Sequence, residues 1–333
     1  MTREDIIKEY GDILHSADSI IDNAPPLISI SPKLDIALGG GVPEGSLFMM
    51  TGPEKIGKTI LALQVCKNAQ KVVVPEGEKR KIYYGNIEGR LKARDIRGVH
   101  GLDRNPELFE VIGSRKGNIL TGEKYLSAFD KIIYNEPHSV VVIDSFSALA
   151  AEREIVGEIV DSDVAPMHKF VAKFTRRFAN VLPINRVTLV GITHLMANIA
   201  FGAKKTKVEK TSNALKYAQD VKLWGTHKIP IKKGDTQIGQ EAHWIVENTA
   251  TDTPPGQKVT SIIKYGRGIW EEYELITVAK DFGIVEGAGW MTIPGVDKKI
   301  QGLVGAATYL EENPSAYSDL KSTVFEMVGL ECG

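Results

Sequence analysis

The segment 52-GPEKIGKT-59 decides the fold, because its glycines and lysine have the spacing of a phosphate-binding loop. Gly52 is followed by four residues and then by Gly57, Lys58 and Thr59, which satisfies the P-loop pattern in full. Glycines let backbone N–H groups converge on an anion, lysine reaches the terminal phosphates, and a threonine hydroxyl can hold Mg²⁺. The flanking sequence must decide between such a loop and a chance cluster of turn-forming residues.

The flanks of the loop have the pattern that a P-loop requires. SLFMMT (46–51) predicts a buried strand and KTILALQVCKNAQ (58–70) predicts a helix, so the loop joins a strand to a helix. Short apolar runs alternating with helical patterns continue along the chain, which predicts an α/β fold with a mostly parallel sheet covered on both faces. The further predicted strands are 81–87, 108–112, 139–144 and 186–193, and the predicted helices between them are 121–135 and 166–182.

The N-terminal segment predicts a single amphipathic helix. Thr2 can cap it, and Ile6, Tyr10 and Leu14 fall on one face at helical spacing. An extended connector with two prolines follows this helix. The apolar face therefore packs either on its own domain or on a neighbouring subunit, and the sequence leaves both open.

The C-terminal part has a different pattern. Residues 246–266 contain two strand-like runs around a Pro-Pro-Gly turn, which predicts an antiparallel hairpin late in the core. Beyond it the pattern predicts a small C-terminal α/β unit. We therefore expect an N-terminal helix and linker over 1–30, a core over 31–269 and a small domain over 270–333.

The composition favours a soluble globular protein and excludes a global basic field. The chain has 333 residues, 43% of them hydrophobic and 25% charged, and its net charge is −1. Any nucleic-acid binding must therefore come from a local patch. Two cysteines, Cys66 and Cys332, and a charged N-terminus without an apolar signal segment predict a reduced, cytoplasmic compartment and no membrane partner.

Three polar residues end predicted strands, where open α/β sheets bind their ligands. Asp144 ends SVVVID (139–144) and suits a Mg²⁺ site through water. Glu88 ends KIYYGNIE (81–88) and could orient the water that attacks a γ-phosphate, and His194 ends LVGITH and could donate a hydrogen bond to that phosphate. Taken singly, each also has a structural interpretation: a turn-starting aspartate, a solvated glutamate and a packed histidine.

These pieces, in this order, resemble the RecA family of DNA strand-exchange recombinases over nearly the whole chain. The resemblance implies a RecA-type P-loop ATPase core with an N-terminal oligomerisation helix and a small C-terminal α/β domain. His194 is similar to the histidine of UvsX-like phage members, where cellular bacterial members have glutamine. The resemblance is carried by residues 29–59, 140–163, 192–202, 212–224 and 264–290.

The resemblance assigns nucleotide roles residue by residue. Lys58 and Thr59 would hold phosphates and Mg²⁺, and Asp144 would hold the water on Mg²⁺. Glu88 would be the catalytic carboxylate and His194 the γ-phosphate switch. The full nucleotide-binding set that it implies is Gly52, Pro53, Glu54, Lys55, Ile56, Gly57, Lys58, Thr59, Ile60 and Asp144.

The resemblance also implies two DNA-binding loops, one over about 156–166 and one over about 195–212. Val164 would lie near the bases in the first loop, and Ile199 would part stacked bases in the second. Two basic residues of the helix after the first loop would face DNA phosphates, and three residues after the second would contact phosphates through backbone N–H groups. These residues are Lys169 and Arg176, and Thr211, Ser212 and Asn213.

A cluster of lysines supports the second loop without the resemblance. FGAKKTKVEKTSN (201–213) has four lysines against a single acid, Glu209. A local positive strip in a nearly neutral chain suits a phosphate backbone, whereas most charge runs are merely solvated. The lysine strip consists of Lys204, Lys205, Lys207 and Lys210.

The chain departs from the family pattern at three places. Glu247 and Thr249 stand where bacterial members have two lysines that reach the neighbour's ATP. Lys92 and Asp95 stand at the positions of the adenine contacts. The pair Thr211-Ser212 replaces two glycines in the second loop and stiffens it.

The function implied by the resemblance is a DNA-dependent ATPase that forms a helical filament on single-stranded DNA and exchanges strands. It implies ATP and Mg²⁺ as cofactors, and single- and double-stranded DNA, further copies of the chain, and single-strand-binding and loader proteins as partners. Two alternatives stay open: a RecA-fold ring helicase or motor, and a nucleotide-gated assembly protein without useful turnover. Glu88 discriminates against the last, since a pure binder needs no carboxylate there.

Overall fold

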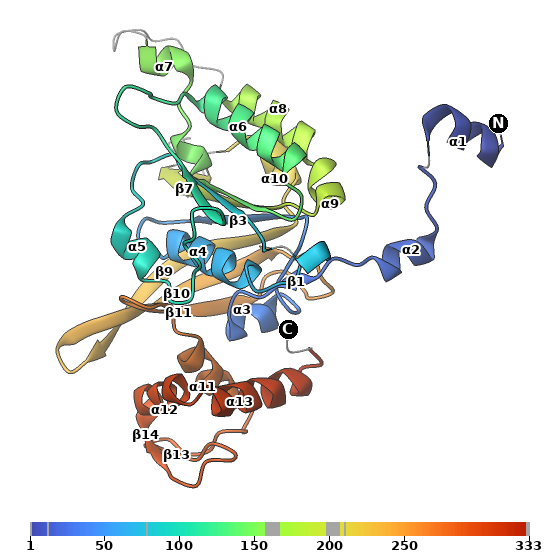
Figure 1. The fold of residues 1–333 in the computed structure, drawn as a ribbon. Helices are drawn as coiled ribbons and strands as arrows, with labels where there is room; N and C mark the ends of the chain where they lie inside the picture. Colours follow the sequence, from blue (N-terminus) through green and yellow to red (C-terminus); the bar gives the residue numbers. More distant parts are fainter. Residues whose placement is uncertain are drawn as a thin grey trace.

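A mixed β-sheet runs through the centre of the chain (Figure 1). The structure is a computed structural model, and it describes residues 2–11, 13–77, 79–156, 167–197, 207–209 and 211–330. From β9 through β3, β7, β6 and β4 to β5, each strand is parallel to the next. On the other side of β9, strands β10, β11 and β12 pair antiparallel, beginning with the pair β9–β10. This arrangement confirms the predicted α/β class with a mostly parallel sheet. In sheet order the strands are β12 (Gly268–Ile269), β11 (Lys258–Lys264), β10 (Thr236–Asn248), β9 (Val221–Lys233), β3 (Leu47–Gly52), β7 (Thr188–Ala197), β6 (Val140–Asp144), β4 (Ile82–Asn86) and β5 (Phe109–Ile112).

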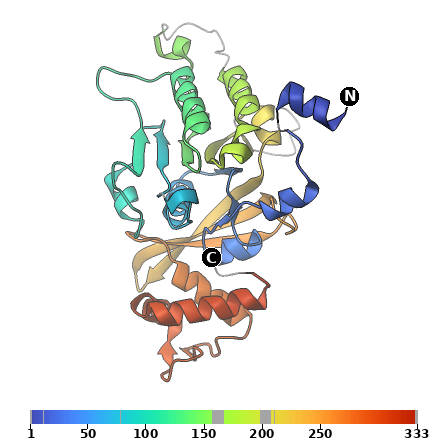
Figure 2. The ribbon, with the colours of Figure 1, turned by 45° about the vertical axis from the view of Figure 1, so that its right-hand side comes forward.

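Both faces of the parallel part are buried, because successive residues of each strand point to opposite faces. Phe48 and Met50 of β3 pack in a core with α4, whereas Leu47 and Met49 pack in a second core with α6 and α8. α6 and α8 lie side by side over the second face in both views (Figure 1, Figure 2). The covering helices are α3 (Pro32–Ala37), α4 (Lys58–Ala69) and α5 (Ala93–Arg97) with the first core, and α6 (Gly122–Asn135), α8 (Met167–Phe178), α9 (Val181–Asn185) and α10 (Asn213–Tyr217) with the second.

The predicted late hairpin is confirmed as the antiparallel pair β10–β11. A longer hairpin, β9–β10, was not predicted. Its distal half is largely exposed, so it lacks the apolar alternation that marks a half-buried strand. It turns at Gly234, whose φ is 60°.

A further cluster of buried residues lies in the C-terminal unit below the sheet (Figure 2). Leu275 of α11, Leu310 of α12 and Phe325 of α13 belong to it. The proposed boundaries after residues 30 and 269 stay predictions. The elements of this unit are α11 (Glu271–Asp281), β13 (Trp290–Met291), β14 (Ile300–Gln301), α12 (Gly302–Glu312) and α13 (Pro314–Met327). The remaining short elements are β1 (Leu27–Ile28), β2 (Val42–Pro43), η1 (Pro75–Gly77), η2 (Phe146–Ala148), α7 (Glu152–Val156) and β8 (Lys207–Glu209).

The N-terminal arm projects from the body of the protein (Figure 1). It consists of α1 (Arg3–Tyr10) and α2 (Ala17–Asp22), neither of which has a buried residue. Thr2 caps α1: its hydroxyl accepts a hydrogen bond from the Asp5 N–H, and the Asp5 carboxylate accepts one from the Thr2 N–H. The apolar face of α1 therefore does not pack on its own domain, and docking on a neighbouring subunit stays a prediction. Among the described residues, no helix has the length and apolar character that crossing a bilayer requires.

Because α1 adds nothing to the core, replacing Ile6 and Tyr10 together with Asp should leave the thermal midpoint within about 2 °C of wild type. The same change should remove the predicted subunit contact, which sedimentation velocity would show as loss of self-association. Leu34→Asp, at a fully buried position of α3, is the destabilising control. Unfolding of the α1 variant would favour packing on its own domain.

Candidate nucleotide-binding site

The phosphate-binding loop lies at the carboxyl end of β3, in the middle of the sheet. β3 ends at Gly52, α4 begins at Lys58, and the parallel register with β7 places Gly52 opposite His194. The first N–H groups of α4 lack intrahelical partners, and the helix dipole adds partial positive charge there. The loop therefore has the backbone arrangement of an anion site.

Two glycines of the loop are required by close packing. Gly57 has a φ of 120°, and a Cβ there would lie 2.3 Å from the Cδ1 atom of Ile263. A Cβ on Gly52 would lie 3.0 Å from the Cα atom of Gly225 on β9. Strands β9 and β11 thus pack closely on the loop: a side chain at Gly57 would strain its backbone and push the Ile263 side chain aside, and one at Gly52 would crowd the backbone of β9.

Gln240 of β10, the strand between β9 and β11, also supports the loop, and no sequence pattern indicated this role. Its amide Nε2 donates hydrogen bonds to the carbonyl oxygens of Lys55 and Ile56, each at 3.1 Å. Lys55 itself has a φ of 60°, so the loop takes an unusual backbone conformation at the residue that Gln240 holds.

The Lys58 ammonium is buried within the loop. Its Nζ donates to the carbonyl oxygens of Gly52 at 2.8 Å and Pro53 at 2.9 Å. Burial lowers the pKa of Lys58 to about 8, although the carboxylates of Asp144 and Glu88 oppose the shift. A phosphate beside this ammonium would supply the negative charge that restores its usual pKa.

Thr59 and Asp144 come together as predicted for a Mg²⁺ site. The Thr59 hydroxyl donates to the Oδ2 atom of Asp144 at 2.9 Å, and the Tyr84 hydroxyl donates to the same oxygen at 2.6 Å. Burial raises the pKa of Asp144, and these two donors oppose the shift. A hydroxyl and a carboxylate beside a phosphate loop are the oxygen donors that suit Mg²⁺. Tyr84 is a further site residue that sequence reasoning missed.

Glu88 and His194 are in direct contact, although the sequence placed them only on separate strand ends. The Nε2 atom of His194 lies 2.5 Å from Oε1 of Glu88, and the Ser145 hydroxyl donates to the same oxygen at 2.8 Å. The hydrogen bond from His194 lowers the pKa of Glu88 to about 2, against the effect of burial. Glu88 is therefore a carboxylate at any physiological pH. The Ser147 hydroxyl accepts a hydrogen bond from the His194 N–H, which fixes the backbone there.

Some of the residues predicted to contact DNA lie in the described part of the chain, and others lie outside it. Lys169 and Arg176 lie one heptad apart on α8 and are exposed, opposite its buried stripe. Ser212 caps α10 by accepting from the Leu215 N–H, Asn213 begins that helix, and Thr211 precedes it. Val164, Ile199, Lys204, Lys205 and Lys210 lie outside the described residues, and of Lys207 only the backbone is described, on β8.

The residues that replace the family's ATP and adenine contacts have local partners. Glu247 lies 3.2 Å from Lys222, and the Thr249 hydroxyl donates to the carbonyl oxygens of Thr251 and Thr253. The Asp95 carboxylate accepts from the Lys92 N–H at the start of α5. Each of these contacts is structural, and none tests the nucleotide role.

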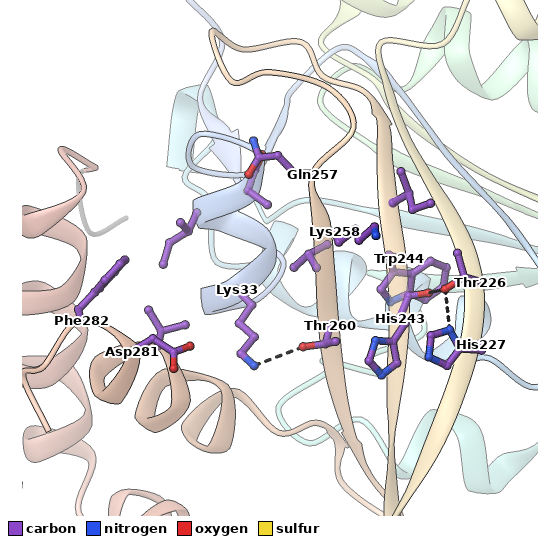
Figure 3. Close-up of a pocket in the computed structure, with 15 residues that line it drawn as sticks. Lys33, Thr226, His227, His243, Trp244, Gln257, Lys258, Thr260, Asp281 and Phe282 are labelled. Atoms are coloured by element: carbon purple, nitrogen blue, oxygen red, sulfur yellow. Dashed lines mark hydrogen bonds between the residues drawn. The ribbon is translucent and has the colours of Figure 1, made fainter. Parts of the chain in front are cut away.

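A cavity beside the sheet has none of the residues 52–59 in its lining (Figure 3). It measures about 620 Å³, and α3, α11 and strands β9 to β11 contribute to its lining. Lys33 donates to Thr260 across it, and the rings of His227 and His243 stack with centroids 4.2 Å apart. The predicted nucleotide-binding residues do not line this cavity, so it is not the predicted nucleotide site.

Comparisons with known proteins agree with the geometry. The family model of the RecA N-terminal domain matches residues 95–270. The chain is 30% identical over 329 residues to Protein RecA of Rubrobacter xylanophilus, covering 96% of this chain and 89% of that protein. It is also 30% identical over 330 residues to Protein RecA of a Nocardioides species, covering 96% of this chain and 87% of that protein.

Because burial holds the pKa of Lys58 near 8, nucleotide binding at pH 9 should take up roughly half a proton or more. The phosphates raise the pKa of the ammonium again, so affinity should fall as the pH rises from 8 toward 10. Calorimetry of ATP binding in buffers of different ionisation enthalpy measures the uptake. Lys58→Arg keeps its charge throughout and should show none. Equal uptake by the two proteins would contradict the assignment.

Proposed function

The chain belongs to the RecA family of recombinases, and from this premise we propose that it is a DNA-dependent ATPase that forms a helical filament on single-stranded DNA and exchanges strands. ATP and Mg²⁺ are its proposed cofactors, and single- and double-stranded DNA its proposed partners. The main support for the proposal is the contact between Glu88 and His194. It links the proposed catalytic carboxylate to β7, the strand that leads into the second predicted DNA-binding loop.

The chain's own residues prepare the nucleotide for hydrolysis. Lys58 and the N-terminus of α4 would bind phosphate charge, Thr59 would hold Mg²⁺, and Asp144 would hold a water on Mg²⁺. Mg²⁺, when bound, neutralises charge on the terminal phosphates. Tyr84 keeps the Asp144 carboxylate oriented through its 2.6 Å hydrogen bond.

Glu88 orients the attacking water. With a pKa of about 2 it is a weak proton acceptor, so it acts chiefly by accepting a hydrogen bond and by its negative charge. His194 and Ser145 share its Oε1 atom. We therefore infer that His194 exchanges its bond to Glu88 for one to the γ-phosphate, and that this exchange moves the end of β7.

DNA binding then depends on backbone charge and base stacking. Lys169 and Arg176 present exposed cations from one face of α8, and the four lysines of the strip, which follow β7 in the sequence, would add positive charge. Such a surface binds single strands with little sequence preference. The exposed face of α1 is the proposed contact between neighbouring subunits, and single-strand-binding and loader proteins are proposed further partners.

Other functions have less support. The relatives named RecA extend over 96% of the chain, which favours a recombinase over a ring helicase or motor. The carboxylate of Glu88, placed at a strand end in contact with His194, favours an enzyme over an assembly protein without useful turnover.

Glu88→Gln should preserve ATP binding and slow hydrolysis by about 100-fold or more, since the amide lacks the charge that orients and activates water. The trapped nucleotide should prolong DNA-bound assemblies. Phosphate release and fluorescent-nucleotide binding, each with and without single-stranded DNA, measure the two effects. Glu110→Gln, on the exposed face of edge strand β5, is the matched control. Unchanged hydrolysis would exclude the proposed role of Glu88.

Replacing Lys204 and Lys205 with Ala should flatten the salt dependence of DNA binding. Each lysine that neutralises a single-strand phosphate contributes about 0.7 to the slope of log K against log salt, so two contribute up to about 1.4. Binding should weaken equally for all DNA sequences, and the DNA-free ATPase should persist. Titrations at several salt concentrations test this, with Lys79→Ala and Lys81→Ala, beside the amino end of β4, as the control. An unchanged slope would show that the lysine strip is merely solvated.

A further inference from the structure

Glu209 is buried, although the sequence placed it as a single acid within the lysine strip. Its side chain is 4% exposed. It lies on β8, which pairs antiparallel with the end of β7 and aligns Glu209 with Leu195. The backbone of Glu209 therefore closes the base of the second predicted DNA loop, and its side chain points into the protein.

One carboxylate oxygen of Glu209 bridges two strands of the nucleotide site. Its Oε1 atom accepts hydrogen bonds from the hydroxyls of Thr51 at 2.8 Å and Thr193 at 2.7 Å. These two threonines are register partners on β3 and β7, and each directly precedes a residue of the site, Gly52 or His194. Glu209 thus contacts the two strand ends one residue before the phosphate loop and the γ-phosphate switch.

The other oxygen binds a buried cation. The Lys222 ammonium donates to Oε2 of Glu209 at 2.7 Å, and it also lies 3.2 Å from Glu247. Burial opposes ionisation of Glu209, but Lys222 and the two threonines outweigh it, so the net effect is a lowered pKa. We name Glu209, Thr51, Thr193 and Lys222 the Glu209 cluster.

Through the Glu209 cluster, the position of β8 and the positions of the carboxyl ends of β3 and β7 depend on one another. Moving β8 away would leave the Thr51 and Thr193 hydroxyls, which lie 2.7 Å apart, with only each other, and the Lys222 ammonium with only Glu247. Hydrogen bonds to a charged group in such surroundings are strong, so exchanging the Glu209 carboxylate for these weaker partners costs free energy. A displacement of the loop base therefore changes the surroundings of Gly52 and His194, and the reverse holds as well.

We propose that Glu209 is a positioning residue that couples the second DNA-binding loop to the nucleotide site through Thr51 and Thr193. The proposal rests on the proposed function, since it presumes that the chain binds both ATP and single-stranded DNA. It differs from the switch proposed for His194, because the link runs through the base of the loop and not through a contact with the γ-phosphate.

The test is the reciprocal coupling between the two ligands. The affinity of a fluorescein-labelled oligo-dT is measured with and without ATPγS, and that of a fluorescent ATP analogue with and without unlabelled oligo-dT. In wild type the two ligands should strengthen each other by the same factor. Glu209→Gln should lower that factor about fivefold or more in both directions, while nucleotide affinity without DNA stays within twofold. Lys222 keeps Glu247 as a partner, so the variant should fold.

Controls separate coupling from stability. Glu110→Gln should behave as wild type. Thr193→Val, which removes one donor without changing side-chain volume, should lower the coupling factor, and the combination with Glu209→Gln should add little, because both break one link. Wild-type coupling in Glu209→Gln, or a lowered DNA-free nucleotide affinity with unchanged coupling, would overturn the inference. Absence of coupling in the wild-type protein itself would instead overturn the proposed function on which the inference rests.

Discussion

The parallel pairing of β3 with β7 is the constraint on which the site depends. Its register sets Thr51 beside Thr193 and Gly52 beside His194, so the phosphate loop and the predicted switch begin at the same level of the sheet. Because side chains alternate along a strand, a slip of one residue would turn Thr51 away from Glu209 and move each core residue of β3 into the core on the opposite face of the sheet. The two cores hold this register, since Phe48 and Met50 fill one and Leu47 and Met49 the other.

Burial at these strand ends has opposite consequences for the ionisable groups. It lowers the pKa of Lys58 and raises that of Asp144, because in both it disfavours the charged form. Glu88 escapes this rule, since His194 and Ser145 hydrogen-bond to its charged form and lower its pKa. The candidate site thus holds one carboxylate that stays ionised, Glu88, and two groups, Lys58 and Asp144, whose charged forms a bound phosphate and Mg²⁺ would stabilise. Because Lys58 and Asp144 are poorly solvated in the free protein, they would lose little hydration when a nucleotide and Mg²⁺ bind.

The sequence predicted those parts of the site that local signals encode. The P-loop has a fixed spacing, and Asp144, Glu88 and His194 each end an apolar run, so strand prediction located them. Gln240 and Glu209 gave no such signal, since their roles depend on which strands become neighbours. In the sequence, Glu209 stands out only as the single acid among four lysines, and its inward side chain depends on the pairing of β8 with β7. The β9–β10 hairpin was missed because its exposed half has no apolar period.

A polar link between β8 and the strand ends differs physically from an apolar one. Apolar contacts depend on buried area and weaken gradually as an element slides, whereas the hydrogen bonds of the Glu209 carboxylate to its donors are lost over a short displacement. A buried ion pair such as Glu209–Lys222 is therefore weak evidence for stability but suits a contact that must select one arrangement. Glu247 gives Lys222 a second acid, so releasing Glu209 does not strand the cation. The charged hydrogen bonds of Glu209 thus select one position of β8, and the second acid beside Lys222 allows β8 to leave that position.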